Sequence, residues 1–370
     1  MKKFRMSAFI MMLVVALVLT ACSGGSGSGS SQSSSSSSSS SGGSGSGGSS
    51  APQSSGEQQK EKVSITLSAG IETPEEGIYY ETVKYLQDVL PQRTDNQIKV
   101  DIYPNQQLGN EVSMLEGVRS GSVDITVTGI GNFSSFVPKF QVFSVPYIFK
   151  NYDVYRAAMK PDSEVWGIMK RIVEEADLGF TLGAPTTVGS RWVVNTKGEV
   201  RTPDDLAKLN VKMRVQASPI ETEVWSGYGA HTVNMPMPEV YAAMKQGVVD
   251  AVENAPSILY TNKIHEVANY FSATDHSYYV ALVSISNAAL EKMPEDLRQI
   301  VLEVLEEAGQ HALDLSLEMH QDYVNKIKET GVTVTEVDKE AFASMVEPIQ
   351  ARVAEETGGM EIFEAIKRLE

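Results

Sequence analysis

A tract of serine and glycine divides this chain of 370 residues and confines any folded body to the part that follows it. Between positions 23 and 50 every residue is Ser or Gly except Gln32. Such a tract has no large apolar side chain whose burial could offset the entropy lost when the backbone is ordered. Residues 22–62 are therefore predicted to form a flexible tether with an r.m.s. reach of roughly 30–40 Å, either as a leash or as an inert spacer. The folded body is predicted to begin near Val63.

The segment before the tract has the pattern of a bacterial export signal. Three basic residues lie within the first five positions, and an apolar run over residues 8–20 follows them. This run is shorter than the roughly 20 residues that a membrane-spanning helix needs. Cys22, the only cysteine of the chain, follows a Leu-Thr-Ala sequence that resembles a lipobox. We therefore expect residues 1–21 to be a lipoprotein signal peptide. Cys22 would carry a lipid anchor that holds the protein outside the cytoplasm on the bacterial cell membrane, with an ordinary signal peptide as the alternative.

The composition excludes several classes of partner and site. With 31 basic and 47 acidic residues the formal net charge is −16, so a nucleic acid would be repelled. The negative electrostatic potential of such a chain disfavours anions in general. An anionic ligand would need a few local arginines to bind. The single cysteine excludes an intramolecular disulfide and a zinc site built on several cysteines.

Strand-like and helix-like segments alternate through the body. Strands are expected at 63–69, 98–103, 123–128, 191–195, 211–215, 248–252 and 278–285, and helices at 79–90, 109–120, 238–247 and 295–330. This alternation predicts an α/β fold of two domains with mostly parallel sheets, in which ligands bind at the C-terminal ends of the strands. The last helix would be roughly 50 Å long, enough to lie across both domains and tie them together.

No catalytic or cofactor motif stands out in the body. The five histidines show no metal-ligand spacing, and the body has no P-loop, no GxGxxG after a strand and no GxSxG elbow. Together with the expected anchor and tether, this pattern favours a binding protein over an enzyme. No cofactor and no metal are expected.

Two arginines lie on predicted strands, where a charged side chain needs a partner. Arg191 opens one strand, and Arg214 lies between Met213 and Val215 near the end of another. The planar guanidinium fork can bind a carboxylate at two points, which predicts a clamp for an organic acid. A salt bridge to one of the many acidic residues is the alternative and, from composition alone, the more common situation.

Four segments resemble, in order along the chain, the motifs of one transporter family. They are YPNQQLG at 103–109, VPYIF at 145–149, KMRV at 212–215 and the segment 237–254, which contains EVYAAMKQGVVD. Their combination over most of the folded chain resembles the DctP-type solute-binding proteins of tripartite ATP-independent periplasmic (TRAP) transporters.

The resemblance implies a two-lobed α/β fold like that of periplasmic binding proteins (a Venus flytrap), with discontinuous lobes and a long helix spanning both. Residues 63–188 and 280–319 would form lobe I, and residues 189–279 and 320–370 would form lobe II. The ligand would bind in the cleft, and the lobes would close over it.

The resemblance also implies ligand-binding residues in lobe II. Arg214 matches the family's carboxylate-binding arginine, which makes the clamp the preferred interpretation of this residue. Arg191 matches a second arginine of members that bind sialic acid, and Asn254 matches a polar residue that contacts the ligand acid. Met237 matches a position where an aromatic ring often stacks on the ligand, with a core methionine as the alternative.

Two residues of lobe I, Glu111 and Ser68, match positions near groups that touch ligand hydroxyls. A helix N-terminal acid and a turn serine are the respective alternatives. Arg191 with Arg214 would suit a C4-dicarboxylate, whereas Arg214 with Glu111 and Asn254 would suit a uronic or aldonic sugar acid. We favour the sugar acid, because a carboxylate at Glu111 would repel a second ligand carboxylate.

The expected function is the capture of an organic acid and its delivery to the small and large integral membrane subunits of a TRAP permease. The resemblance implies that an ion gradient, not ATP, drives the uptake, and a tethered monomer is expected. A ligand sensor that docks on a membrane receptor is one alternative. An ABC-type binding protein is another, which the motifs disfavour.

Overall fold

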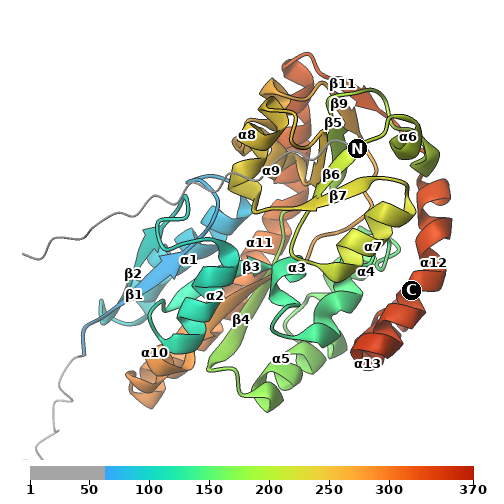
Figure 1. Cartoon of the computed structure of the whole chain (residues 1–370). Helices are drawn as coiled ribbons and strands as arrows, with labels where there is room; N and C mark the ends of the chain where they lie inside the picture. The colour runs from blue at the N-terminus through green and yellow to red at the C-terminus, as the bar shows by residue number, and fades with distance from the viewer. Residues whose placement is uncertain (1–62) are drawn as a thin grey trace, which may run out of the picture. The chain divides into compact units, whose positions relative to one another are not determined.

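The computed structural model of the chain describes residues 63–370. The expected signal peptide, the Cys22 anchor and the tether lie outside these described residues and stay predictions. The described part is a mixed α/β structure with two sheets, and the chain crosses between them more than once (Figure 1).

The first sheet has five strands in the order β2-β1-β3-β10-β4. They are β1 (Ile65–Gly70), β2 (Ile98–Tyr103), β3 (Ile125–Gly129), β4 (Phe180–Thr186) and β10 (Ala281–Ser286). The first three strands pair in parallel, as expected, but β10 runs antiparallel to both of its neighbours. The start of β10 pairs with the end of β3, because the chain re-enters this sheet at the edge where the parallel strands end.

Helices from both halves of the chain cover the first sheet. They are α1 (Ile78–Arg93), α2 (Glu111–Ser120), α3 (Ile130–Phe133), η1 (Pro138–Ser144), α4 (Tyr152–Ala158), α5 (Glu164–Ala176), α10 (Asn287–Glu291) and α11 (Glu295–Glu329). Helix α1 packs against β2 and α11, and α2 packs against β3 and β10. In α1 the side chains of Val83, Leu86 and Leu90 are fully buried, as their helical spacing predicts.

The second sheet has six strands in the order β11-β9-β5-β8-β6-β7. They are β5 (Trp192–Asn195), β6 (Lys212–Val215), β7 (His231–Asn234), β8 (Ala251–Asn254), β9 (Tyr270–Ser272) and β11 (Thr333–Thr335). Its helices are α6 (Pro203–Lys208), α7 (Pro219–Gly227), η2 (Met237–Glu239), α8 (Val240–Lys245), α9 (Pro256–Thr261) and η3 (Ile264–Glu266). Strand β6 is parallel to both β7 and β8, whereas β5 is antiparallel to β8 and β9.

Two of the expected strands begin three residues later than the sequence pattern indicates. Val248 is half exposed and precedes β8, because its amide donates to the carbonyl of Ala243 and completes the turn after α8. Gly247 makes this turn with a φ of +71°. Residues 278–280 likewise precede β10, since they belong to the crossing between the sheets, where Tyr278 forms an isolated bridge with Ser190.

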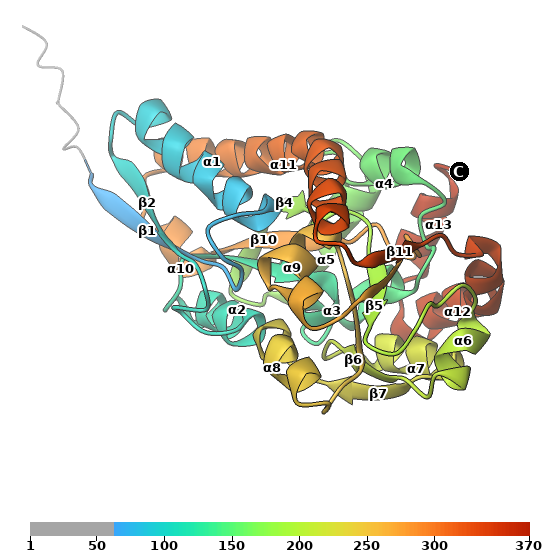
Figure 2. The ribbon, with the colours of Figure 1, turned by 90° about the horizontal axis from the view of Figure 1, so that it is seen from above.

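The long helix expected from residue 295 to 330 is confirmed as α11, a single helix of 35 residues. It packs against α1 and β4 of the first sheet and, further along, against α9 of the second (Figure 2). A helix that contacts elements of both sheets connects them, as its apolar stripe predicts.

The last two helices, α12 (Lys339–Thr357) and α13 (Met360–Lys367), contact elements of both halves of the molecule. Phe342 and Val346 of α12 belong to the apolar core of the second sheet, but α12 also packs against η1. Helix α13 packs against α5. The expected lobe boundaries place α13 and α5 in different lobes, and those boundaries stay a prediction.

Within residues 63–370, no helix is both long enough and apolar enough to cross a membrane.

The contact between α11 and β4 predicts a stability change at Gly309. A Cβ atom there would lie 2.6 Å from Cβ of Ala184 and 2.6 Å from the carbonyl oxygen of Pro185. We expect Gly309→Ala to push the helix off the sheet and lower the free energy of unfolding by about 1–3 kcal/mol, as overpacking does. Urea unfolding measures this change.

Gly167→Ala on α5 is the matched control. A Cβ atom at Gly167 has no neighbour within 4 Å, so this variant should raise the free energy of unfolding by about 0.5–1 kcal/mol through helix propensity. Equal stabilisation by the two substitutions would show that α11 is not pressed against β4.

Candidate functional site

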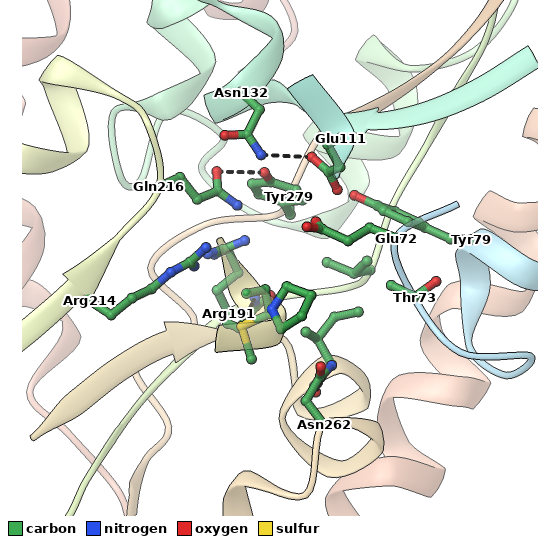
Figure 3. Close-up of a pocket in the computed structure, with 15 residues that line it drawn as sticks. Glu72, Thr73, Tyr79, Glu111, Asn132, Arg191, Arg214, Gln216, Asn262 and Tyr279 are labelled. Atoms are coloured by element: carbon green, nitrogen blue, oxygen red, sulfur yellow. Dashed lines mark hydrogen bonds between the residues drawn. The ribbon is translucent and has the colours of Figure 1, made fainter. Parts of the chain in front are cut away.

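A pocket lies where strands of both sheets end (Figure 3). Its polar lining consists of Glu72, Thr73, Tyr79, Glu111, Asn132, Arg191, Arg214, Gln216, Asn254, Asn262 and Tyr279. Glu72 follows β1, Asn254 ends β8, and Arg214 and Gln216 lie at the end of β6. The C-terminal ends of strands are where open α/β sheets bind ligands, so the pocket is where the alternating pattern predicts it.

Arg214 is a buried cation without an acidic partner. The residue is 2% exposed, and its Nε donates to the carbonyl of Met235 at 2.8 Å. Its Nη1 is buried with no hydrogen-bond partner, and no ion pair of Arg214 occurs within residues 63–370. Burial lowers the pKa of this guanidinium, because desolvation disfavours the charged form. The salt-bridge interpretation of Arg214 is therefore not supported, and its charge is free to meet an anion.

Arg191 is buried as well but is already paired. Its Nε and Nη2 each lie 2.5 Å from a carboxylate oxygen of Glu253, and Nη2 also donates to the Glu253 carbonyl at 3.1 Å. The guanidinium lies over the ring of Tyr279, 4.2 Å from its centroid. Only Nη1 of Arg191 lacks a partner. The charge of Arg191 is thus neutralised by the protein, while one of its N–H groups remains available.

Glu253 is held ionised by this arrangement. His276 adds a contact from its Nε2 to the Glu253 carboxylate at 3.1 Å. Burial by itself would raise the pKa of Glu253, but the charge of Arg191 and the hydrogen bonds from His276 and Arg191 lower it to about 2.

Asn254 and Met237, both expected at the site, line the pocket side by side. The Nδ2 atom of Asn254 lies 3.6 Å from the sulfur of Met237, and its Oδ1 accepts from the amide of Ala255 at 2.9 Å. Met237 is 8% exposed, so it is both a buried apolar residue and part of the pocket wall.

Glu111 lines the pocket and is also the first residue of α2, so it is a helix N-terminal acid, and its contact with a ligand stays a prediction. One of its oxygens accepts from the amide of Gly129 at 2.8 Å and from the Nδ2 of Asn132 at 2.9 Å. Burial raises the pKa of Glu111 in spite of these two donors. The structure thus brings Arg214, Arg191, Asn254, Met237 and Glu111 to one pocket.

Ser68 is not brought to this pocket. It lies within β1, and its hydroxyl donates to Asp124 at 2.9 Å and accepts from the Asp124 amide at 3.0 Å. Because β1 continues to Gly70, the residue that reaches the pocket from this strand is Glu72.

The polar residues of the lining that were not expected from the sequence are Glu72, Thr73, Tyr79, Asn132, Gln216, Asn262 and Tyr279. Glu72 is the first acidic residue after a parallel strand, and this position is the signal that could have found it. Tyr279, whose hydroxyl donates to Gln216 at 2.8 Å, lies in the crossing segment, where no periodic pattern indicates a site. No group of three or more His, Cys, Asp or Glu residues in the described part of the chain is arranged to hold a metal ion.

Comparison with known proteins identifies the family. The model of the bacterial extracellular solute-binding proteins, family 7 (DctP), matches residues 69–357. The chain belongs to this family. The match supports the TRAP interpretation and not the receptor or ABC-type alternatives, and it makes this DctP protein an extracytoplasmic solute-binding protein of a transport system.

Similar proteins extend over most of this chain. The 2,3-diketo-L-gulonate-binding periplasmic protein YiaO of Escherichia coli is 31% identical over 279 residues, which cover 75% of this chain and 83% of that protein. A TRAP periplasmic solute-binding protein from Chromohalobacter salexigens with bound D-glucuronate superimposes with a TM-score of 0.76 at 27% identity, covering 82% of this chain and 100% of that one. Another such protein, from Polaromonas and bound to D-erythronate, superimposes with a TM-score of 0.75 at 26% identity. The match covers 81% of this chain and 97% of that one.

The buried Arg191–Glu253 pair predicts a large effect of Glu253→Gln in this DctP protein. Removing the carboxylate leaves Arg191 buried without a counter-charge, so the free energy of unfolding should fall by about 3–5 kcal/mol at pH 7. The pKa of Glu253 is lowered from 4.5 to about 2 in the folded protein. The ionised carboxylate therefore contributes to the free energy of unfolding above pH 4.5, and this contribution is lost as the pH falls toward 2. The difference in the free energy of unfolding between the unmodified protein and Glu253→Gln should decrease as the pH falls from 4.5 to about 2.

Glu303→Gln is the control, because it removes an acid from an exposed pair with Arg93 and should change stability little. Denaturant unfolding at several pH values measures both variants. If Glu253→Gln were as stable as the control variant at pH 7, the pair would not stabilise the fold.

Proposed function

We propose that this DctP protein captures a sugar acid with a single carboxylate and hands it to the small and large membrane subunits of a TRAP permease. The observation that carries the proposal is Arg214, a buried arginine at the pocket with an unpartnered nitrogen and no acidic partner in the described chain. An uncompensated buried charge is destabilising, and a ligand carboxylate would compensate it.

Arg191 would assist Arg214 at the same carboxylate. Its unpartnered Nη1 is a donor in the lining of the same pocket. Since Glu253 already neutralises Arg191, the two arginines together offer one net positive charge to the ligand. Asn254 would contribute its amide beside them.

This charge count favours a sugar acid over a C4-dicarboxylate. A second ligand carboxylate would face Glu72 and Glu111 with no cation left to pair with, and like charges at such a site repel. Carboxyl groups and the hydroxyl of Thr73 instead suit ligand hydroxyls, and Thr73 Oγ1 is buried without a partner. The bound D-glucuronate and D-erythronate of the similar proteins support this choice.

Capture would proceed by closure of the two halves over the ligand. Arg214, Asn254 and Glu111 are each less than 8% exposed, so a ligand reaches them only when the elements that carry them move apart. Closure then removes water, lowers the local dielectric and strengthens the pairing of Arg214 with the carboxylate. Contacts of the ligand with both halves provide the differential affinity that favours the closed form. The protein would release the same molecule that it binds, without chemical conversion.

The N-terminal part of the proposal rests on the sequence alone. A lipid anchor at Cys22 and the Ser/Gly tether would keep a monomeric binding protein near its permease on the outer side of the membrane.

Arg214→Ala tests the clamp. We expect the variant to lose sugar-acid affinity by at least about 100-fold, because the charged pair with the carboxylate is lost. Its ligand-free stability should change little, since the variant loses one hydrogen bond to the Met235 carbonyl but also an uncompensated buried charge. Calorimetric titration and thermal melting against uronates, aldonates, C4-dicarboxylates and neutral sugars measure the affinity and the class of ligand.

Arg201→Ala, which removes an exposed arginine, is the control and should bind like the unmodified protein. Near-native affinity of a folded Arg214→Ala protein would exclude the clamp. Melting shifts with neutral sugars alone would exclude a carboxylate ligand.

A further inference from the structure

Two carboxyl groups, those of Glu72 and Glu111, face the same part of the pocket opposite Arg214 (Figure 3). Glu111 has one oxygen occupied by two donors, the amide of Gly129 and the side chain of Asn132. The carboxyl of Glu72 has no hydrogen bond and no ion pair to any residue that the structure describes. The wall opposite the arginine is therefore a pair of acids with one member unpartnered.

The backbone holds Glu72 firmly in this position. The amide of Ile71 donates to Tyr103 at 3.0 Å, and the Ile71 carbonyl accepts from Gln106 at 3.3 Å. On the other side, the carbonyl of Thr73 accepts from the amide of Asn105 at 2.9 Å. Asn105 and Gln106 adopt left-handed conformations with φ of +54° and +59°, so this turn is specialised for its shape. These bonds fix the main chain at Glu72 beside the pocket.

The closed, ligand-bound pocket has fewer cations than carboxylates. The positive charge of Arg191 is matched by Glu253, and that of Arg214 would be matched by the ligand carboxylate under the function proposed above. No other cation of the described pocket lining then remains for Glu72 and Glu111. Two adjacent carboxyl groups that are removed from water cannot both stay ionised at neutral pH.

We propose that the pocket captures its ligand together with one proton, which the Glu72–Glu111 pair holds while the pocket is closed. This inference rests on the proposed function, because the ligand carboxylate occupies the last free cation. The proton comes from solvent and returns to solvent when the pocket opens. A protonated Glu72 both donates and accepts a hydrogen bond, which suits a ligand hydroxyl.

The surroundings of Glu72 agree with this assignment. Burial first, and then the charge of Glu111, raise the pKa of Glu72, while Arg214 lowers it and Glu239 raises it. The net effect is a pKa of about 8 instead of 4.5. Tyr79, which faces the pair from α1, is a neutral phenol whose own pKa is raised by burial. Pairing Arg214 with a ligand carboxylate would weaken the one influence that keeps Glu72 ionised.

The linkage has a defined sign. Opening exposes Glu72 to water and returns its pKa toward 4.5, whereas closure raises it to about 8, so ligand-driven closure takes up a proton between these values. Affinity then increases as the pH falls through this interval, and the dissociation constant rises by up to about tenfold per pH unit between roughly pH 5.5 and 7.5.

Calorimetry in two buffers of different ionisation enthalpy, phosphate and Tris at pH 7, counts the protons. The probe is D-glucuronate or, if another acid of the panel above binds more tightly, that acid. We expect the unmodified protein to take up about one proton more per ligand than Glu72→Gln. The slope of log Kd against pH should be smaller by about one in Glu72→Gln than in the unmodified protein.

Three variants separate the groups involved. Glu116→Gln removes an exposed acid from α2 and should bind and take up protons like the unmodified protein. Glu221 is a second buried acid, whose pKa is raised to about 7 by burial and by Glu253. Glu221→Gln should retain the proton uptake that Glu72→Gln loses. If Glu72→Gln does not bind the ligand, Glu221→Gln still tests whether Glu221 takes up the proton.

Each outcome has a distinct meaning. Binding without proton uptake, or with the same uptake in Glu72→Gln as in the unmodified protein, overturns this inference and leaves the sugar-acid function standing. Uptake that disappears in Glu221→Gln and persists in Glu72→Gln overturns it as well. If no acid of the panel binds to the unmodified protein, the proposed function fails and the inference fails with it.

Discussion

The buried pair between Arg191 and Glu253 is the interaction on which the rest of the site depends. Two arginines buried at one pocket would repel each other and oppose folding, but Glu253 neutralises Arg191 at two points. Arg214 is left as the cation without a counter-charge at the pocket. This division of roles underlies the proposal of a ligand with one carboxylate, because one positive charge in the pocket lining remains to be matched.

The path of the chain places groups from distant parts of the sequence around that charge. Strands β1 and β3 bring Glu72 and Asn132 from the first sheet, and β6 and β8 bring Arg214 and Asn254 from the second. The crossing segment adds Tyr279, and α11 packs against elements of both sheets. Because both halves contribute to one pocket, any motion that admits a ligand also changes the hydration of every ionisable group in its wall.

Local patterns predicted much of this structure. The amphipathic spacing of α11, the alternating segments of β1 to β3 and the motif that contains Arg214 all led to elements that the structure confirms. The predictions that were wrong concern residues whose position is decided by a contact with a distant or turn residue. Residues 248–250 look apolar enough for a strand, but a turn hydrogen bond holds Val248 at the surface. Ser68 lies close in sequence to the pocket-lining residue of its strand, yet its hydroxyl is committed to Asp124.

The sequence by itself determined the α/β class and the long connecting helix, and its motifs marked Arg214 as the candidate for binding a carboxylate, since periodicity and motifs are local properties of the chain. Only the tertiary structure decided which arginine is neutralised and which acids form the opposite wall. Arg191 and Glu253 are 62 residues apart in the sequence, and Glu72 and Arg214 line the same pocket from different sheets. Pairing and desolvation of charges depend on distance in space, which the order of residues does not specify.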